Sequence, residues 1–269
     1  MKLALAQLDQ TAGDVDANVD RAATAVADAA DRGADLIVLP ELFTVGYFAF
    51  DTYARAAEGL DGPTFDRLAD LAADHGVGLL GGSHVEDLAA SAAAGVDVPA
   101  TEGLANTCVF YDRDGRRRGV YRKHHLFGYE SAETRLLTPG ESLSTVAFEG
   151  FTVGMSTCYD LRFPELYRRL ADRGATLVCV PSAWPYPRVE HWQTLSQARA
   201  IENLCYVAAA NGAAAFEDAT LLGRSTVYDP WGTPVASAGD DPTLVVTEID
   251  PDRVEAVRED FPALRDRRD

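Results

Sequence analysis

Apolar and polar positions follow two different periods in the first forty residues. Residues 2–8 alternate as a β-strand does, whereas the alanine-rich residues 15–32 have the spacing of an amphipathic helix that Gly33 ends. The apolar run 35–39 has the length and composition of a buried strand. The chain therefore opens with a predicted strand–helix–strand unit.

The pattern is less regular between residues 40 and 105. After an aromatic loop we expect helices near 51–58 and 63–75, and then an apolar strand near 77–84. Residues 88–105 contain Ala, Gly and Pro with little period. This segment is predicted to be an exposed insertion.

Turn residues separate short strand-like runs in the middle of the chain, which predicts two hairpins. Their strands are expected at 107–111, 119–122, 144–148 and 151–157. Helices and strands then alternate, with expected helices at 163–173 and 189–203 and expected strands at 176–180, 205–210, 225–229, 233–236 and 243–249. Residues 251–269 are predicted to form a polar C-terminal helix and a charged tail.

One segment of the chain is echoed later. Residues 31–40 and 172–181 match in residue type at nearly every position, each reading as a helix end, a glycine, a buried strand and a proline. Any helix–glycine–strand junction has this form, so the echo has a plain explanation. The alternative is a pair of related helix-on-sheet layers, which would place Glu41 and Ser182 at equivalent sheet ends.

Alternation of helices with strands, interrupted by hairpins, is typical of an α/β protein with mixed sheets covered by helices. Hydrophobic residues make up 47% of the 269 residues, which is ample for a sizeable core. We expect residues 1–269 to form a single domain. Functional sites in such folds gather where strand ends meet loops.

The net charge of the chain argues against polyanionic binding partners. The 42 acidic and 24 basic residues give a net charge of -18, and such a surface repels nucleic acid and anionic membranes. Acidic excess with lysine nearly absent also indicates a halophilic protein, because salt screens the self-repulsion. The start of the chain has too short an apolar run for a signal peptide, and no stretch is long enough to span a bilayer.

Four cysteines, at 108, 158, 179 and 205, show no CxxC spacing, and three lie in apolar strand-like runs. Buried reduced thiols in a cytoplasmic protein are therefore expected for all except Cys158. Cys158 stands between an apolar strand and a helix opened by Pro164, where its pKa is expected to be low.

Two further residues complete a possible site. Lys123 is one of only two lysines and ends a strand-like run, and Glu41 ends the strand 35–39. A carboxylate can take a thiol proton, and an ammonium with a backbone N–H, here that of Tyr159, can stabilise an oxyanion. Together with Cys158 these groups suit acyl transfer through a thioester.

At these residues the sequence resembles the carbon-nitrogen hydrolases of the nitrilase superfamily. Pro40-Glu41, the segment Tyr121-Arg122-Lys123 with His125-Leu126, and the block from Cys158 to Glu165 match the three motifs of that family in order. The resemblance implies a Glu41–Lys123–Cys158 triad and a four-layer α-β-β-α sandwich. It further implies homodimers or larger homo-oligomers and neither metal nor organic cofactor.

The resemblance also implies a second glutamate that holds substrate and lysine. Counting back from Thr138-Pro139-Gly140 indicates Glu133, with Glu130 as the alternative. Tyr47, Phe127, Tyr159 and Trp184 are candidate substrate-binding residues, and Arg188 is a candidate partner for a substrate carboxylate. Arg162 and Glu165 are expected to form a structural ion pair, and His191 and Trp192 to support the cleft wall.

We therefore expect an amidase that converts a small non-peptide carboxamide to carboxylate and ammonia. The blocks Ala198–Asn203 and Trp231-Gly232 most resemble the branch of omega-amidases and deaminated-glutathione amidases. Nitrile or N-carbamoyl hydrolysis by the same triad is an alternative, as is a catalytically silent binding homologue. Adjacent His124 and His125, with no Cys or carboxylate at ligand spacing, would form a poor zinc site.

Overall fold

Two mixed β-sheets lie face to face in the computed structural model, which describes residues 1–128 and 131–268. The seven-stranded sheet has the order β13 (Thr243–Glu248), β1 (Lys2–Gln7), β2 (Leu36–Val38), β3 (Gly78–Leu80), β5 (Leu104–Tyr111) and β4 (His84–Asp87), with β6 (Arg117–Arg122) paired to β5. The six-stranded sheet has the order β12 (Pro234–Ser237), β11 (Thr226–Tyr228), β10 (Tyr206–Asn211), β9 (Leu177–Ser182), β8 (Phe151–Met155) and β7 (Thr145–Phe148).

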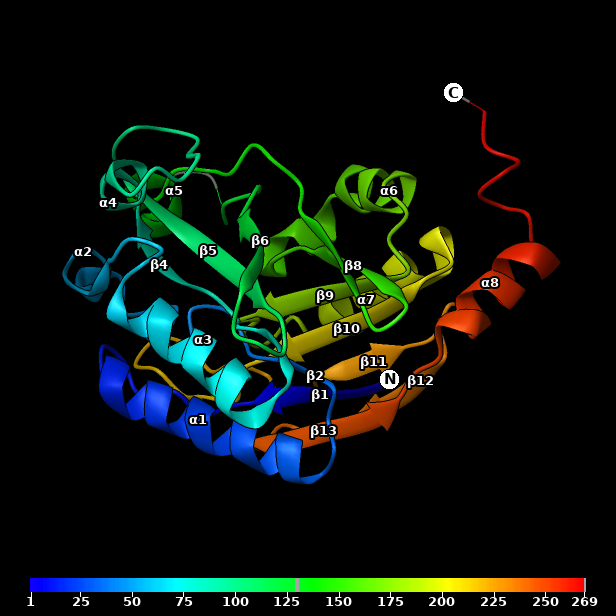
Figure 1. Cartoon of the computed structure of the whole chain (residues 1–269), viewed down its shortest axis with the longest axis horizontal. Coiled ribbons are helices and arrows are strands. Elements are labelled where there is room, and N and C mark those ends of the chain that lie inside the picture. The colour runs from blue at the N-terminus through cyan, green and yellow to red at the C-terminus, as the bar shows by residue number, and fades with distance from the viewer. Residues whose placement is uncertain (129–130, 269) are drawn as a thin grey trace.

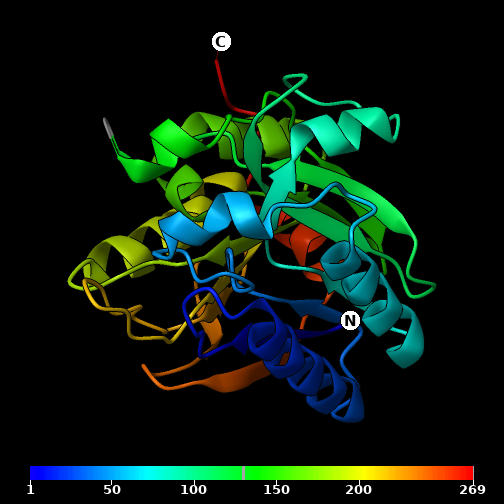
Figure 2. The same cartoon turned by 90° about the vertical axis from the view of Figure 1, so that its left-hand side faces the viewer.

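Four main helices cover the outer faces of these sheets. The helices α1 (Val15–Asp31) and α3 (Pro63–His75) lie against the first sheet, and α6 (Pro164–Asp172) and α7 (Val189–Asn203) against the second (Figures 1 and 2). Alternation within β1 explains the layering: Leu3 and Leu5 belong to the core between the sheets, whereas Ala4 and Ala6 pack with the helix layer. The expected α-β-β-α sandwich is confirmed.

The repeated sequence segment corresponds to a repeated structure. β2 is the middle of three parallel strands, β1, β2 and β3, and β9 is the middle of β8, β9 and β10. The amide N–H of Glu41 donates to the carbonyl oxygen of Ser182 at 3.4 Å. The ends of the two equivalent strands therefore meet, which favours two related helix-on-sheet layers over a chance likeness.

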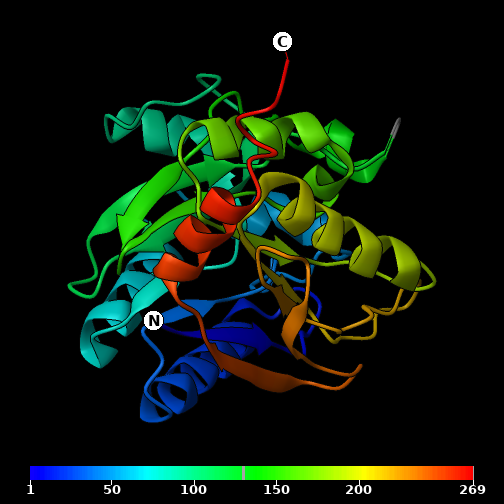
Figure 3. The same ribbon diagram turned by 90° about the vertical axis from the view of Figure 1, so that its right-hand side faces the viewer.

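Smaller elements connect the layers. They are η1 (Phe50–Thr52), α2 (Tyr53–Ala56), α4 (Leu88–Ala93), α5 (Ala132–Leu136), η2 (Cys158–Arg162) and α8 (Pro251–Asp260). Figure 3 shows α8, in red, beside α7, with the end of the chain leading away. Arg258 fixes α8 by donating to the carbonyl oxygens of Leu204 and Ala175. Among the described helices, none is long and apolar enough to cross a membrane.

Several predicted boundaries were wrong, including the starts of the strands expected at 107 and 119, which lie at Leu104 and Arg117. The strand expected at 77–84 is broken into β3 and β4, because Gly82 turns the chain with φ 56° close to the backbone of Pro40. The helix expected at 51–58 stops at Ala56, since Glu58 bridges to Glu86 in extended form. The strand expected at 151–157 ends at Met155.

Segment 88–105 is also not simply an exposed insertion. Asp87 caps α4 by accepting from the amides of Ala89 and Ala90, and the helix side chain Leu88 is fully buried. The last two residues of the segment belong to β5. Runs of three exposed residues lie at 93–95, which is the end of α4 and the turn after it, and at 101–103.

Candidate active site

Three segments distant in the chain bring Glu41, Lys123 and Cys158 together at the ends of strands. The Lys123 ammonium donates to Oε1 of Glu41 at 2.8 Å, and the same carboxylate lies near enough to the Cys158 thiol to raise its pKa. All three residues are buried. The arrangement places a thiol, a carboxylate and an ammonium around one point.

Each side chain is held by the local backbone. Lys123 follows β6 and stays paired to β5 through its amide N–H, which donates to the carbonyl of Asn106 at 2.9 Å. Glu41 lies just beyond β2, and its Oε2 accepts from the amide of Ala183 at 2.9 Å. Cys158 begins η2 with φ 46°, a conformation that L-residues rarely adopt and that directs the thiol out of the turn.

Glu133 joins this group from α5. Its Oε1 accepts from the Lys123 ammonium at 2.7 Å, and its Oε2 accepts from the Tyr47 hydroxyl at 3.0 Å and from the Phe127 amide at 2.5 Å. Glu133 is fully buried, so Lys123 lies between two carboxylates. Glu130, the alternative from the sequence, lies outside the described residues.

Asn106 was missed by the sequence analysis. Its side-chain amide donates to Oε1 of Glu41 at 2.8 Å and to Oε1 of Glu133 at 3.5 Å. Asn106 faces Lys123 across the β5–β6 hairpin, because Thr107 is paired with Arg122. The sequence held one signal for Asn106. It immediately precedes the strand expected at 107–111, and Lys123 immediately follows the partner strand expected at 119–122, so the predicted hairpin would set the two residues opposite each other.

Burial and charge set the protonation states. Burial alone would lower the pKa of the Lys123 ammonium, but Glu133 and Glu41 outweigh it and raise that pKa, so Lys123 stays charged. Burial raises the pKa of Glu41, Lys123 opposes this effect, and Glu133 adds to it. Glu41 is thereby a better proton acceptor than an ordinary glutamate.

The low pKa expected for Cys158 was wrong. Burial raises the pKa of its thiol well above the usual range, the Glu41 carboxylate raises it further, and Lys123 only partly opposes them. Five residues, namely the rest of η2 and Phe163, separate Cys158 from Pro164, the first residue of α6. The raised pKa keeps the Cys158 thiol neutral in the resting state.

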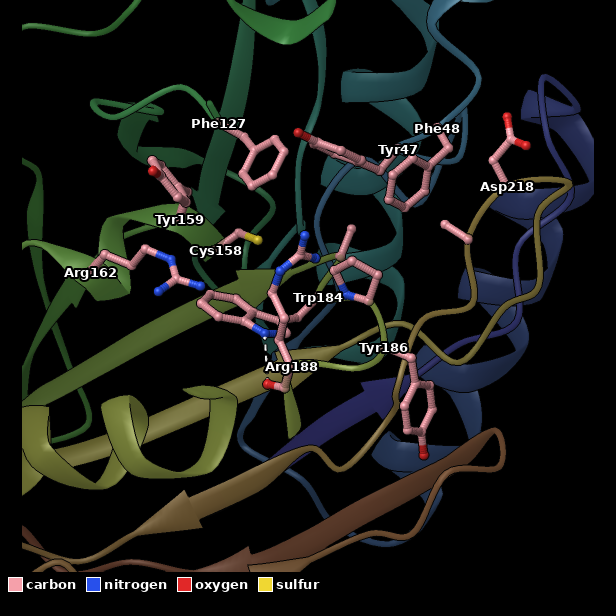
Figure 4. Close-up of a pocket in the computed structure, with 13 residues that line it drawn as sticks. Tyr47, Phe48, Phe127, Cys158, Tyr159, Arg162, Trp184, Tyr186, Arg188 and Asp218 are labelled. Carbon is pink, nitrogen blue, oxygen red and sulfur yellow. Dashed lines mark hydrogen bonds between the residues drawn. The ribbon is translucent and has the colours of Figure 1, made fainter. Parts of the chain in front are cut away.

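The thiol opens into a cavity of about 210 Å³. All four expected substrate-binding residues line it, namely Tyr47, Phe127, Tyr159 and Trp184. In Figure 4, Tyr47 and Phe127 lie on one side of the Cys158 sulfur, and Trp184 lies on the other. The cavity has room for a compact, partly apolar substrate.

Two arginines also line the cavity (Figure 4). The expected Arg162–Glu165 ion pair is absent from the described residues: Arg162 donates to Nδ1 of His191 at 3.1 Å, and its guanidinium carbon lies 5.1 Å from the Trp184 ring centroid. The Arg188 guanidinium carbon lies 5.8 Å from the Phe127 ring centroid. Neither guanidinium has a carboxylate partner in the described part of the chain.

The cleft wall behind Trp184 is also rigid. Trp192, in α7, lies 5.7 Å from Trp184 between ring centroids, and its indole N–H donates to the carbonyl of Arg224 at 2.9 Å. The Trp184 indole N–H donates to the carbonyl of Arg188 at 3.1 Å. The position expected for His191 and Trp192 is therefore the one observed.

Comparisons with known proteins identify the family of this chain. The family model described as carbon-nitrogen hydrolase matches residues 2–259. A 2-oxoglutaramate amidase of Paenarthrobacter nicotinovorans is 36% identical over 239 residues, covering 87% of this chain and 79% of that protein. The omega-amidase NIT2 of Homo sapiens is 34% identical over 275 residues, covering 99% and 95%.

Solved structures give the same result. Saccharomyces cerevisiae Nit3, a member of branch 10 of the nitrilase superfamily, has a TM-score of 0.86 at 32% identity, covering 97% of this chain and 94% of Nit3. An amidase from Nesterenkonia sp. AN1, whose active-site cysteine carries acrylamide by Michael addition, has a TM-score of 0.81 at 30% identity, covering 97% of each chain. The chain belongs to the carbon-nitrogen hydrolase family of the nitrilase superfamily.

Proposed function

We propose that this protein is an amidase that hydrolyses a small carboxamide to a carboxylate and ammonia through a thioester on Cys158. One observation carries the proposal: the Glu41 carboxylate accepts from the Lys123 ammonium and raises the pKa of the Cys158 thiol, and Cys158 lines the cavity. A thiol alone in a cavity would need a base, and the Glu41 carboxylate lies close enough to serve as one.

The first half-reaction forms the thioester. The Cys158 sulfur attacks the amide carbon while its proton passes to Glu41, and the carbonyl oxygen becomes an oxyanion. Lys123 and the backbone N–H of Tyr159 stabilise this oxyanion. When the C–N bond breaks, Glu41 returns the proton to the leaving nitrogen, which departs as ammonia.

The second half-reaction releases the acid. Glu41, again ionised, takes a proton from a water molecule as that water attacks the thioester carbon. The second oxyanion occupies the same position beside Lys123. Collapse breaks the C–S bond, restores the thiol with the proton from Glu41 and releases the carboxylate. Glu133 holds Lys123 in place throughout, because it accepts two hydrogen bonds from the ammonium.

The two arginines indicate an anionic substrate. Arg162 and Arg188 reach the cavity from different elements, and both lack a carboxylate partner within the described residues of a strongly acidic chain. A guanidinium binds a carboxylate in a two-pronged geometry. We therefore infer an omega-amide of a short carboxylic acid, the class to which the names of the 2-oxoglutaramate amidase and omega-amidase relatives refer.

Matched substrates test the reaction type. Ammonia release is measured for an amide, a nitrile and an N-carbamoyl compound that share one acyl chain with a terminal carboxylate. The proposal predicts the highest kcat/KM for the amide and complete loss of turnover in Cys158→Ala. A higher kcat/KM for the nitrile or the carbamoyl compound would show that the protein is a nitrilase or a carbamoyl hydrolase and not an amidase. Release of no ammonia from any of the three compounds would favour a catalytically silent homologue.

A further inference from the structure

Asp160 is a buried carboxylate that the mechanism above does not use. It lies in η2, two residues after Cys158, and its side chain is fully buried. Its Oδ2 accepts from the Thr157 amide at 2.9 Å and from the Tyr121 hydroxyl at 2.5 Å. Its Oδ1 accepts from the amide of His125 at 2.9 Å and forms a 2.8 Å hydrogen bond with Nδ1 of the same residue.

The partners of Asp160 come from the two segments that carry the candidate catalytic residues. Thr157 immediately precedes Cys158, whereas Tyr121 and His125 stand two residues before and two residues after Lys123. Asp160 thus joins the nucleophile turn to both sides of the lysine. The His125 ring is fixed in turn by stacking on Phe163, with ring centroids 3.7 Å apart and planes at 8°.

A side chain with two acceptor oxygens is the group that this position requires. Two backbone N–H groups and a phenol converge on Asp160 as donors, and a carboxylate offers lone pairs to all of them and to a protonated Nδ1 of His125. An asparagine would direct its NH₂ group at one of these donors and leave a buried group unsatisfied. The network therefore has little freedom to rearrange.

We propose that Asp160, Tyr121 and His125 form a positioning network that fixes the Lys123 ammonium relative to the Cys158 sulfur. The inference rests on the proposed function, in which both groups act on one carbonyl. None of the three residues is among those that line the cavity, and their hydrogen bonds run to the segments that carry Lys123 and Cys158, so we place their effect on these two residues. Displacement of a reacting group by about 1 Å can lower a rate about 100-fold.

Two buried tyrosines provide a matched test. Tyr121→Phe removes the hydroxyl bound to Asp160, and Tyr167→Phe removes a hydroxyl that forms a 2.8 Å hydrogen bond with Ser156, on the other side of the same turn. We expect Tyr121→Phe to lower kcat by about tenfold or more at unchanged KM, and Tyr167→Phe to change kcat by less than about twofold. Equal losses in both variants would overturn the proposal, because they would report only general destabilisation.

His125 offers a second test at a side chain that is partly exposed. His125→Ala removes the ring bond to Asp160, whereas an asparagine there retains a side-chain N–H that can donate to the carboxylate. We expect kcat to fall in His125→Ala and to recover at least partly in His125→Asn. No recovery, together with equal kcat in the two tyrosine variants, would contradict a positioning role.

Alkylation of Cys158 by iodoacetamide separates this inference from the proposed function. If the parent enzyme released no ammonia from any substrate, the proposed function would fail, but the alkylation rates of the two tyrosine variants could still be compared. The network predicts a changed rate for Tyr121→Phe and a parental rate for Tyr167→Phe. The same rate in both variants would overturn the network.

Discussion

Lys123 is held by three hydrogen bonds from its ammonium, one to Glu41 and two to Glu133. An ammonium is a compact charge whose donors rotate, whereas a guanidinium is a planar fork that needs more room. Lys123 is fully buried, and the centroid of the Tyr47 ring lies 5.4 Å from its Nζ. At the residue scale, the position accepts one kind of cation.

Lys123→Arg is therefore expected to lower kcat by about 100-fold or more, the usual cost of losing an oxyanion donor. The chain supplies its own control, since the other lysine, Lys2, donates to the carbonyl of Arg32 at the surface. Lys2→Arg should retain parental kcat in the same ammonia assay. Parental turnover in Lys123→Arg would remove Lys123 from the mechanism.

Glu41→Gln tests the proton transfer. The amide cannot accept the thiol proton, so iodoacetamide should alkylate Cys158 more slowly at neutral pH than in the parent. Glu165→Gln, the same change at an exposed acid of α6, should leave the rate unchanged. Faster alkylation in Glu41→Gln would mean that the carboxylate acts mainly by raising the pKa of the thiol, as its charge does in the resting state.

Arg162 and Arg188 should decide selectivity for charge. Replacing either with Gln is expected to raise KM about tenfold or more for an amide with a terminal carboxylate, the cost of a charged hydrogen bond, with little change for a neutral amide of equal length. Arg116→Gln, at an exposed arginine paired with Asp114, serves as the control. Equal KM changes for the charged and neutral amides would rule out carboxylate binding.

At the scale of elements, local periodicity predicted α7 correctly from Val189 to Asn203, because its ends are marked by a proline-rich turn and a change to strand residues. It failed at the break between β3 and β4. The apolar run continues through Gly81-Gly82, and the spacing of apolar residues carries no information about the left-handed backbone conformation of Gly82. It also failed for Cys158 acidity, since burial by distant segments decides that pKa and no neighbouring residue reveals it.

Gly82 should therefore tolerate no side chain. A Cβ at this position would lie 2.2 Å from the carbonyl oxygen of Pro40, and φ is already 56°. Gly82→Ala is expected to lower the free energy of unfolding in urea by about 2–4 kcal/mol, the combined cost of a left-handed L-residue and of overpacking. It should also lower kcat, because Pro40 precedes Glu41.

Gly76→Ala is the matched control for that loss. Gly76 has φ 62° but nothing within 4 Å of an added Cβ, so it carries the backbone cost without the clash. Its substitution should cost about 1 kcal/mol and leave kcat unchanged. Similar losses in the two variants would show that backbone conformation alone, and not the approach to Pro40, constrains Gly82.

At the scale of the whole molecule, the net charge of -18 makes the protein sensitive to salt. Added salt should stabilise the fold but weaken the binding of an anionic substrate. Screening is short-ranged in strong salt, with a Debye length of about 3 Å at 1 M against about 10 Å at 0.1 M. Raising KCl from about 0.1 M to 2 M should therefore raise the thermal midpoint, because the acidic surface repels itself less. Formation of homo-oligomers and a cytoplasmic location stay predictions.

The same titration should raise KM for an anionic amide, because salt also screens Arg162 and Arg188, and should leave KM for a neutral amide nearly constant. Sucrose at matched osmolality is the control for excluded-volume effects on the thermal midpoint. An unchanged midpoint in KCl would contradict the halophilic interpretation of the composition.

The exposed turn at 94–95, just after α4, comes after Glu41 in the chain and before Lys123, Glu133 and Cys158. A protease cut or an engineered break there would leave the base on one fragment and the nucleophile on the other. Neither piece could turn over substrate by itself. Ammonia release recovered after the two fragments are mixed would then be proportional to the amount of reassembled protein. The hydrolase could therefore serve as a split-protein reporter of fragment complementation.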